Sequence, residues 1–539
     1  MKSKMLLILP PHKITDFNMF TKPSWGVGRG LPLGLLTVGS YIHSKGYDVK
    51  IIDCRELIVK HKTNEYTQYV IKTVEEFKPD VIGISILTTL FPEALRIACE
   101  LKKNFPDCTI IAGGPHPSTE PELTFQQNRY IDAICIGAGE EVCLDIMEGK
   151  NIDNIPGLMH RNYVSKYVSR PVETDIDKYP FPNLDLVNVD YYTEFTLHTF
   201  VGWGYKGLMA LTSRSCPYSC KFCASDWSKP FRYHSPEYVV EMTKYLSTCD
   251  IDAIWFVDDT IVTIKDRLLR ICKGFIDAKL FYPHTDLRWI CAMRANQVTP
   301  DILEAVKEAG CFSISVGIES GSDHILKVMN KKTTVAINRR ACTYIRDAGL
   351  HLVASYIVGL PGETEEEMND TVAFMQDLSC NSKGMGCFRP LPGSPFYREF
   401  VANGTLVKEE IDWEDLGDFS TITKYVFCNM TREELERYYD KALNKAGVKK
   451  WSTVHGDILL KYPKLIKDIA SKASIRICKS NNYHSSTHIA YRPLSLYALG
   501  NYILLQLYSV LPYRLRRWVR SMMPRLRSIA FFRKWLAEY

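Results

Sequence analysis

Short apolar, β-branched segments alternate with helical patterns through the first 150 residues of the chain. The segments expected as strands are Met5–Leu9, Asp48–Asp53, Val81–Leu87, Thr109–Gly113 and Ala133–Gly137. Between them, apolar residues recur at helical spacing in Gly34–Lys45, Tyr66–Phe77 and Pro92–Asn104. This rhythm indicates parallel strands joined by right-handed crossovers. The sequence therefore predicts an α/β fold that begins with a doubly wound, Rossmann-like parallel sheet over residues 1–150.

A second alternating series begins near Leu208. Residues 151–204, which precede it, are rich in Asn, Asp, Pro and Tyr and contain the rigid sequence Pro180-Phe181-Pro182, so they indicate a linker. The later segments expected as strands are Leu208–Ser213, Ala253–Val257, Leu287–Met293, Phe312–Ile318, Leu352–Val358 and Gly386–Leu391. Six strand–helix units predict a partial TIM-type (β/α)6 barrel over residues 205–400, with an active site at the carboxyl ends of its strands.

Residues 401–539 carry a mostly helical pattern and end in a basic, amphipathic tail, Tyr513–Tyr539. Its basic residues are Arg514, Arg516, Arg517, Arg520, Arg525, Arg527, Arg533 and Lys534, interleaved with Leu, Trp, Met, Ile and Phe. Such a tail is typical either of peripheral contact with an anionic membrane surface or of a helix docked on the barrel with a solvated basic face. The apolar stretch Leu494–Leu511 is interrupted by Asn501 and Gln506, which makes it marginal as a membrane span.

The number of cysteines and the net charge indicate the redox compartment of the protein and the class of its partners. The chain has 17 cysteines and no secretory signal in its first residues, so we expect a reducing, cytoplasmic compartment in which thiolates are free to bind metal. The net charge of +6 is small for 539 residues, and no nucleic-acid-binding signature accompanies it. We therefore expect no nucleic-acid partner.

Three cysteines stand at C-x3-C-x2-C spacing just after the first strand of the predicted barrel. They are Cys216, Cys220 and Cys223. Thiolates at such short spacing can ligate three irons of one 4Fe-4S cluster and leave the fourth iron open to a substrate or cofactor. The alternative is a zinc site, for which His234 or Cys249 would have to supply a fourth ligand.

This segment resembles the signature of the radical S-adenosylmethionine superfamily, in which an aromatic residue, here Phe222, precedes the third cysteine. The resemblance implies that the open iron chelates S-adenosylmethionine and that its reductive cleavage releases a 5′-deoxyadenosyl radical. It also implies cofactor contacts at successive strand ends, namely Asp258 and Asp259, Arg294, Glu319 and Ser320, and Gly359. Each has a plainer alternative: a helix cap for the paired aspartates, a surface ion pair for Arg294, and a capped turn for Gly362-Glu363-Thr364.

The loops of the front sheet resemble those of cobalamin-binding domains. The matching residues are Ser85, Leu87, Gly113, Gly114, Gly137, Gly139 and Glu140, at the carboxyl ends of the third, fourth and fifth strands. Glycines there would leave room for a nucleotide tail, and Ser85 would donate a hydrogen bond to it. No Asp-x-His-x-x-Gly follows the first strand, so the resemblance implies cobalt without a histidine from the protein, and His116 is not assigned to cobalt.

Two other interpretations of the front sheet compete with this one. One is a sheet that has kept the fold and lost the corrin. The other is a nicotinamide-binding Rossmann domain, which the lack of a G-x-G-x-x-G sequence after the first strand disfavours.

Together the resemblances imply a cobalamin-dependent radical enzyme that methylates an unactivated carbon of a small-molecule or lipid-like substrate, with flavodoxin or ferredoxin as electron donor. Enzymes of this kind also form or contract rings oxidatively, as cyclases of tetrapyrrole biosynthesis do, and motifs do not separate these outcomes. A non-catalytic cobalamin or redox sensor is the alternative from another class. A transfer-RNA methylthiotransferase is disfavoured, because the chain lacks the extra cysteine set and a basic RNA-binding module.

Overall fold

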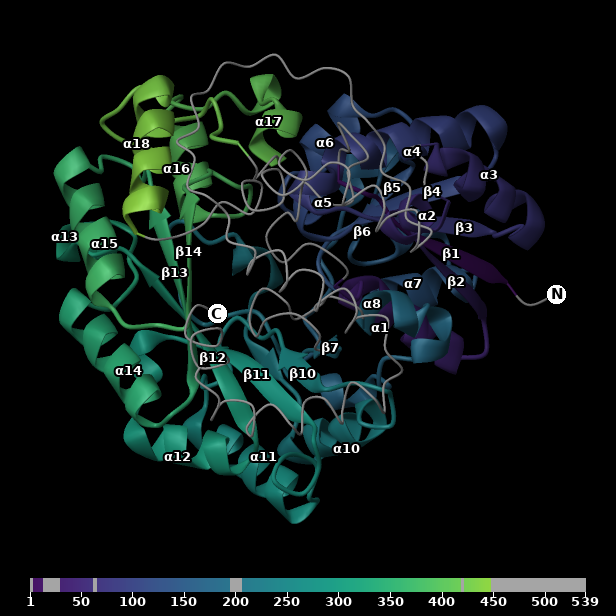
Figure 1. Ribbon diagram of the computed structural model, residues 1–539. Coiled ribbons are helices and arrows are strands. Elements are labelled where there is room, and N and C mark those ends of the chain that lie inside the picture. Colours follow the sequence, from purple (N-terminus) through teal and green to yellow (C-terminus); the bar gives the residue numbers. More distant parts are fainter. Residues whose placement is uncertain (1–2, 13–29, 62–64, 194–205, 418–420, 447–539) are drawn as a thin grey trace, which may run out of the picture. The chain divides into compact units, whose positions relative to one another are not determined.

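The computed structural model describes residues 3–12, 30–61, 65–193, 206–417 and 421–446, and the predicted α/β fold is confirmed (Figure 1). The strands of the first sheet are β1 (Lys4–Leu9), β2 (Asp48–Asp53), β3 (Val81–Ser85), β4 (Thr109–Gly113), β5 (Ala133–Cys135) and β6 (Leu158–His160). The helices between them are α1 (Leu33–Ser44), α2 (Cys54–His61), α3 (Tyr66–Phe77), α4 (Phe91–Asn104), α5 (Pro115–Thr119), α6 (Pro121–Gln127) and α7 (Glu140–Met147).

The first sheet has the strand order β2-β1-β3-β4-β5-β6, and all of its strands are parallel except β6. The chain leaves β1 in one direction to β2 and then crosses over to β3 on the other side. This reversal between β1 and β3 is the switch point at which open sheets of this kind bind ligands, at the carboxyl ends of the strands.

Successive residues of β1 point to opposite faces of the sheet, and both faces are covered. Leu6 and Ile8 pack into the core that α3 and α4 complete, whereas Met5, Leu7 and Leu9 pack into the core that α1 completes. Burial on both faces explains why this strand is a continuous apolar run rather than an alternating one.

The second sheet contains β7 (Gly207–Ala210), β10 (Ala253–Phe256), β11 (Arg288–Met293), β12 (Cys311–Glu319), β13 (His351–Val358) and β14 (Ser382–Cys387). These strands pair in parallel and in chain order, with β7 and β14 at the two edges. The helices that connect them are α10 (Pro236–Leu246), α11 (Lys265–Asp277), α12 (Pro300–Glu308), α13 (Asp323–Val328), α14 (Val335–Asp347) and α15 (Glu365–Asp377). Figure 1 shows α10, α11, α12, α14 and α15 along the outer side of these strands, as expected for a partial barrel.

Several elements differ from the sequence expectation. β3 ends at Ser85 and β5 at Cys135, each two residues before the expected end. β6 lies within the stretch expected as linker and pairs antiparallel with β5. β14 starts at Ser382 and ends at Cys387, before Pro390, which lies in the expected strand Gly386–Leu391 and cannot donate to a sheet ladder. The first barrel strand ends at Ala210, and Ser213–Arg214 forms a separate short strand, β8, paired with β9 (Arg232–Tyr233).

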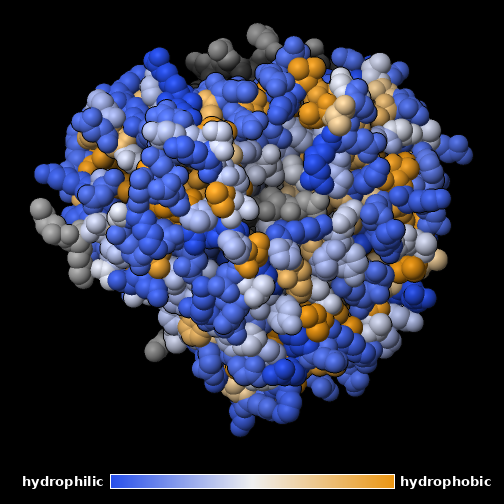
Figure 2. Space-filling view, turned by 180° about the vertical axis from the view of Figure 1, so that it is seen from behind, coloured by the Kyte–Doolittle hydropathy of each residue, from blue (hydrophilic) through white to orange (hydrophobic). Residues whose placement is uncertain are grey.

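After the barrel, the described chain forms α16 (Pro395–Ala402), α17 (Trp413–Gly417) and α18 (Arg432–Lys445). Among the described residues, no helix combines the length and apolar character that crossing a membrane requires. The face seen in Figure 2 is largely hydrophilic, with hydrophobic side chains in small scattered groups. The predicted basic tail and the apolar stretch before it lie outside the described residues.

Candidate active site

A buried carboxylate fixes the start of the loop that carries the three cysteines. Asp258 follows β10 directly and is 2% exposed. Both of its oxygens lie 3.1 Å from the backbone nitrogen of Thr212, and Oδ1 accepts a hydrogen bond of 2.9 Å from the Thr212 hydroxyl and another from the Ser213 hydroxyl. Burial raises the pKa of Asp258, whereas these hydrogen bonds lower it. The arrangement ties β10 to the chain just before Cys216.

The far end of the same loop is held by two other segments. Between α13 and α14, the Met329 carbonyl accepts from the Lys221 backbone nitrogen at 2.8 Å, and the Asn330 amide donates to the Ser219 carbonyl at 2.8 Å. At the start of α16, the Phe396 backbone nitrogen donates to the Lys221 carbonyl at 2.9 Å. The loop has little regular structure of its own, so these contacts determine where its cysteines lie.

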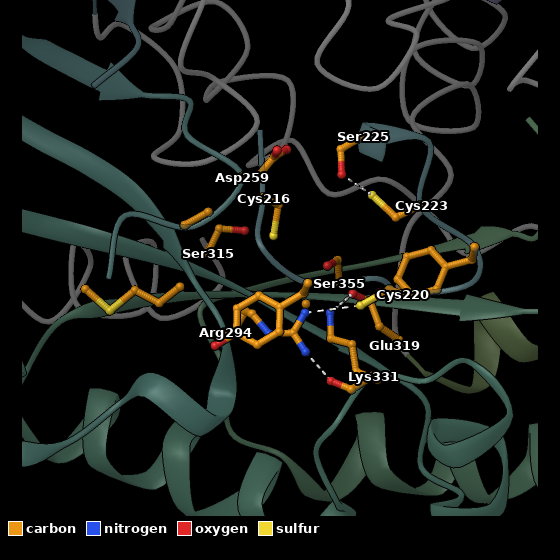
Figure 3. Close-up of a pocket in the computed structure, with 15 residues that line it drawn as sticks. Cys216, Cys220, Cys223, Ser225, Asp259, Arg294, Ser315, Glu319, Lys331 and Ser355 are labelled. Carbon is orange, nitrogen blue, oxygen red and sulfur yellow. Dashed lines mark hydrogen bonds and ion pairs between the residues drawn. The ribbon is translucent and has the colours of Figure 1, made fainter. Parts of the chain in front are cut away.

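Cys216, Cys220 and Cys223 line one pocket of about 240 Å³ (Figure 3). Polar and charged groups from the barrel strands and their carboxyl ends, from the α13–α14 connection and from the segment just after Cys223 line it as well. They are Asp259, Arg294, Glu319, Lys331, Ser225, Ser315 and Ser355. The pocket therefore opens where the sequence analysis expects an active site in a parallel barrel.

Two cations lie among the acidic groups and thiols of the pocket. Arg294 donates from Nη1 to Cys220 Sγ at 3.2 Å, and its guanidinium lies 3.9 Å from the centroid of the Tyr218 ring. Lys331 Nζ donates to Glu319 Oε1 at 2.6 Å. Figure 3 shows both cations beside Cys220 and Glu319. The charges of Arg294 and Lys331 can offset the negative charge of a thiolate-bound cluster and of a bound carboxylate.

The donor set fits an iron–sulfur cluster. Burial raises the pKa of the Cys216 and Cys223 thiols, and metal ligation is the means by which a buried thiol is held deprotonated. No three His, Cys, Asp or Glu side chains among the described residues gather closely enough for a single metal ion.

Neither residue considered as a fourth zinc ligand lines the pocket. His234 Nδ1 lies 2.9 Å from Asp177 Oδ1, with its ring stacked on Tyr238. Cys249 lies in the connection between α10 and β10, before the strand rather than at its carboxyl end. The structure therefore brings neither of them to the thiols.

The predicted S-adenosylmethionine contacts divide into two groups. Phe222, Asp259, Arg294 and Glu319 line the pocket. Asp258, Ser320 and Gly359 are not among its lining residues. Asp258 is bonded to Thr212 and Ser213 as described, and the Ser320 hydroxyl lies 3.2 Å from the Thr371 hydroxyl.

Gly359 lies at a turn that only glycine accommodates easily. Its φ is +78°, and a Cβ there would lie 3.2 Å from a Leu435 methyl group. The position is thus explained by backbone conformation and by packing against α18, independently of any ligand.

Sequence reasoning missed Lys331, Ser225, Ser315 and Ser355, which also line the pocket. Lys331 and its neighbour Lys332 look like solvated charges in the sequence. In the structure, however, only Lys332 is exposed, while Lys331 is buried.

The residues predicted to contact cobalamin lie along the carboxyl edge of the first sheet. Ile86, between Ser85 and Leu87, donates to the Gly113 carbonyl at 2.8 Å, so the loops after β3 and β4 lie side by side. Gly114 has φ of +99°, and a Cβ there would lie 3.0 Å from the Ile86 backbone, so only glycine fits. Leu87 is 42% exposed, an unusual position for a large apolar side chain beside such a loop.

The loop after β5 carries the remaining predicted cobalamin contacts. The Gly137 backbone nitrogen donates to Ser118 Oγ at 3.0 Å, and a Cβ at Gly139 would lie 3.2 Å from a Val38 methyl group. Glu140 begins α7, and its Oε1 lies 2.7 Å from Arg214 Nη2. Because Arg214 precedes Cys216 by two residues, this buried carboxylate joins the front sheet to the cluster loop, and it is committed to that ion pair.

His116 is fully buried and packs between the rings of Phe91 and Trp413, at centroid distances of 4.0 and 4.8 Å. Its Nδ1 lies 3.3 Å from the Thr88 hydroxyl. Burial lowers the pKa of His116 to about 3. This environment gives the side chain a packing role between the front domain and α17.

Comparisons with known proteins agree with this geometry. The profile of the Radical SAM superfamily matches residues 211–375, and that of the B12 binding domain matches residues 27–146. An uncharacterized methyltransferase of Pyrococcus horikoshii is 30% identical over 451 residues, which cover 81% of this chain and 91% of that protein. The chain belongs to the cobalamin-dependent radical S-adenosylmethionine enzymes.

Two further proteins resemble this radical enzyme, a cyclase in sequence and a methyltransferase in structure. An anaerobic magnesium-protoporphyrin IX monomethyl ester cyclase of Rubrivivax gelatinosus is 25% identical, with 69% of this chain and 66% of the cyclase covered. The structure of TsrM, a radical S-adenosylmethionine methyltransferase of Kitasatospora setae with cobalamin and a [4Fe-4S] cluster bound, matches with a TM-score of 0.59 and 18% identity. That match covers 75% of this chain and 78% of TsrM, and it shows the fold.

Membership of this family makes the chain an enzyme whose cofactors are a 4Fe-4S cluster, S-adenosylmethionine and cobalamin. The pocket with three thiols and the glycine-lined edge of the first sheet are the places in the described structure that suit them.

Replacing Asp258 by Ala should lower cluster binding. The change leaves the Thr212 amide and two hydroxyls without an acceptor, which costs about 1–3 kcal/mol and releases the start of the cluster loop. Iron content after anaerobic reconstitution measures the effect. Asp259→Ala is the matched control and should retain the iron, because Asp259 makes no comparable contact with the loop. Full iron content in Asp258→Ala would contradict the positioning role.

Glu363 should make stability depend on pH. It is fully buried in the turn after β13, and its Oε2 accepts from the Leu360 backbone nitrogen at 3.0 Å. Burial raises its pKa from 4.5 to about 8. The folded state thus holds a proton that the unfolded state releases above pH 4.5, so this group's contribution to stability is complete below that pH and is lost as the pH rises to about 8.

The test compares anaerobic urea unfolding of the wild type with that of Glu363→Gln. Between pH 4.5 and about 8, the free energy of unfolding of the wild type should fall by up to about 1.4 kcal/mol per pH unit relative to that of the variant, because the amide of the variant does not titrate. If the free energies of unfolding of the two proteins changed with pH in parallel, Glu363 would be ionised in the folded state.

Proposed function

We propose that this enzyme transfers a methyl group to an unactivated carbon of a small-molecule or lipid-like substrate. The observation that carries the proposal is the ion pair between Glu140 and Arg214, which joins the cobalamin-type loops to the cluster loop two residues before Cys216. A methyl transfer that uses both cofactors needs the two sites beside one substrate. The 30% identity to a methyltransferase over 81% of the chain supports the same reaction.

When bound, the cluster and S-adenosylmethionine supply hydrogen abstraction from carbon, and cobalamin supplies the methyl group. The chain contributes position and charge. Cys216, Cys220 and Cys223 would hold the cluster, while Asp259, Arg294 and Glu319 would orient S-adenosylmethionine in the same pocket. The buried Arg294 and Lys331 give that pocket fixed positive charges where an anionic cofactor group binds.

The front sheet would hold the second cofactor. Gly113, Gly114, Gly137 and Gly139 carry no side chain that would block a nucleotide tail at the carboxyl edge, and Ser85 offers a hydroxyl there. Leu87 presents an apolar surface to the same edge. Glu140 would act through Arg214 rather than on the cofactor, because it already forms the ion pair.

Oxidative cyclisation is the second candidate, and the cyclase of Rubrivivax gelatinosus, 25% identical over 389 residues, favours it. The two reactions differ in what they consume. Methylation uses one S-adenosylmethionine as radical source and another as methyl donor, whereas cyclisation needs only the first use.

Anaerobic turnover with candidate substrates, a strong reductant and methyl-deuterated S-adenosylmethionine should separate them. We expect product to gain one labelled methyl, with 5′-deoxyadenosine and S-adenosylhomocysteine rising together, as measured by mass spectrometry. Cys223→Ala is the control and should give neither coproduct through this route. If the product carries no label and 5′-deoxyadenosine is the only coproduct, the reaction is cyclisation and not methylation.

An external one-electron donor completes the scheme, because cleavage of S-adenosylmethionine starts with reduction of the cluster. We propose a flavodoxin or a ferredoxin for this role. Its reduced form should support formation of 5′-deoxyadenosine in place of a chemical reductant.

The basic tail, Tyr513–Tyr539, would bring the enzyme to an anionic membrane surface and so to a lipid-like substrate. Each Lys or Arg near such a surface contributes about 1 kcal/mol of binding, and the tail carries eight of them among apolar side chains. The full chain should float with anionic vesicles, and a chain cut after Pro512 should float less. Equal flotation of the two would mean that the tail is not an anchor.

A further inference from the structure

The cluster loop has one side in the pocket and another side in solvent. Cys216 and Cys220 line the pocket and are only 9% and 6% exposed, whereas Pro217 and Ser219, which lie between them in the chain, are exposed. The chain therefore runs from solvent to a pocket thiol within a single residue. Because S-adenosylmethionine would fill the pocket of the loaded enzyme, the outer side of the loop is the direct approach to the thiols for another protein.

Basic side chains gather on the segments that form and hold this outer side. Lys229 Nζ donates to the Ser219 hydroxyl at 2.8 Å, and the half-exposed Lys221 lies next to Cys220 in the chain. The α13–α14 connection and the start of α16, which bond to the backbone of the loop, carry further cations. The exposed or half-exposed cations of the three segments, which together with the outer side of the loop we call the loop face, are Lys221, Lys229, Lys327, Lys332 and Arg398.

The loop face has an excess of positive charge. Its five cations compare with three acidic residues, Asp226, Asp323 and Glu399, in segments 217–230, 323–332 and 395–400. Glu399 already lies 3.1 Å from Lys221, and Asp323 accepts from the Val335 backbone nitrogen at 2.7 Å. Exposed ion pairs contribute little stability, whereas a local excess of one charge attracts partners of the opposite charge.

We propose that the loop face is the docking site of a small acidic one-electron carrier, the class to which flavodoxins and many ferredoxins belong. The carrier loses one electron there, and a cluster held on Cys216, Cys220 and Cys223 gains it. Complexes of electron carriers are weak, with interfaces below about 1,200 Å² in total, so charge complementarity can supply most of the recognition. The inference rests on the electron donor of the proposed function and adds the surface that receives it.

The position of the loop face favours a carrier over other anionic partners. An anionic membrane would also suit a basic surface, but nothing in membrane binding requires contact beside the cysteines. Electron transfer does require it, because the donor must come close to the group that it reduces.

The test measures how fast reduced flavodoxin reduces the cluster of the reconstituted holoenzyme, by freeze-quenched electron paramagnetic resonance at low ionic strength. The double variant Lys327→Glu/Lys332→Glu reverses two exposed charges of the loop face. It should slow the reduction ~10-fold or more, because charge steering raises association rates by about 10- to 1,000-fold. The difference should shrink at high salt, which screens exposed charges. Dithionite needs no docking surface and should reduce both proteins equally fast.

Lys78→Glu/Lys279→Glu is the matched control. Both lysines are exposed and have a positive φ, as Lys332 does. They precede β3 and β11, so they lie at the amino ends of strands, away from the cluster loop. The control lowers the formal net charge as much as the first variant does, and flavodoxin should reduce it at the wild-type rate. An equal loss in the control would overturn the proposal, because net charge rather than the loop face would then set the rate.

The remaining outcomes separate this inference from the proposed function. Wild-type rates with flavodoxin in Lys327→Glu/Lys332→Glu would overturn the docking site and leave the donor in place. An equal loss with dithionite would also overturn it, since the variant would then have altered the cluster loop. If dithionite reduces the wild type but neither flavodoxin nor ferredoxin does, the proposed donor fails and the docking site with it. If the variant loses binding to anionic vesicles but keeps its rate of reduction, the loop face is a membrane contact instead.

Discussion

The carboxylate of Asp258 is the contact on which the geometry of the site depends. β7 and β10 pair in parallel with Ala210 beside Phe256, so the residues that follow the two strands leave the sheet at the same edge. Asp258 uses this proximity to bind Thr212 and Ser213, and the cluster loop starts from a fixed point as a result. A loop of ten residues with almost no regular structure could not otherwise present three thiols to one pocket, because its conformational entropy would oppose it.

A second set of charged contacts relates the two sheets to each other. Glu140 of the front sheet binds Arg214 beside the cluster loop, and Glu141 binds Lys178 at 2.8 Å. The residue before Lys178, Asp177, accepts from the Ser235 backbone nitrogen and contacts His234 at the start of α10. The stretch expected as a linker thus contacts α7 and the start of α10 through two neighbouring residues. Such a brace favours one relative position of the two cofactor sites, which a reaction that shares a substrate between them requires.

The sequence allowed most strands and the cysteine site to be predicted because both leave local signals. A parallel strand buried on two faces is a short apolar run, and three thiolates at close spacing mark a cluster loop. The roles of Asp258 and Asp259 could not be separated in this way. Neighbouring residues at a strand end point in different directions, and only the structure shows that Asp259 lines the pocket while Asp258 faces Thr212. β6 was missed because three residues carry too little pattern to distinguish a strand from a linker.

Lys331 could not be found from sequence for a different reason. Its partner Glu319 lies twelve residues earlier, across α13, and the contact exists only because β12 and the α13–α14 connection meet above Gly317. Two adjacent lysines in a sequence ordinarily both have side chains exposed to solvent. Two features of the backbone distinguish the site of Lys331. Gly317, which has no side chain, lies against the ion pair, and Glu319 has a positive φ of +66°. The pair could therefore be recognised only once the fold had placed β12 beside the α13–α14 connection, because neither partner is distinguished by its neighbours in the sequence.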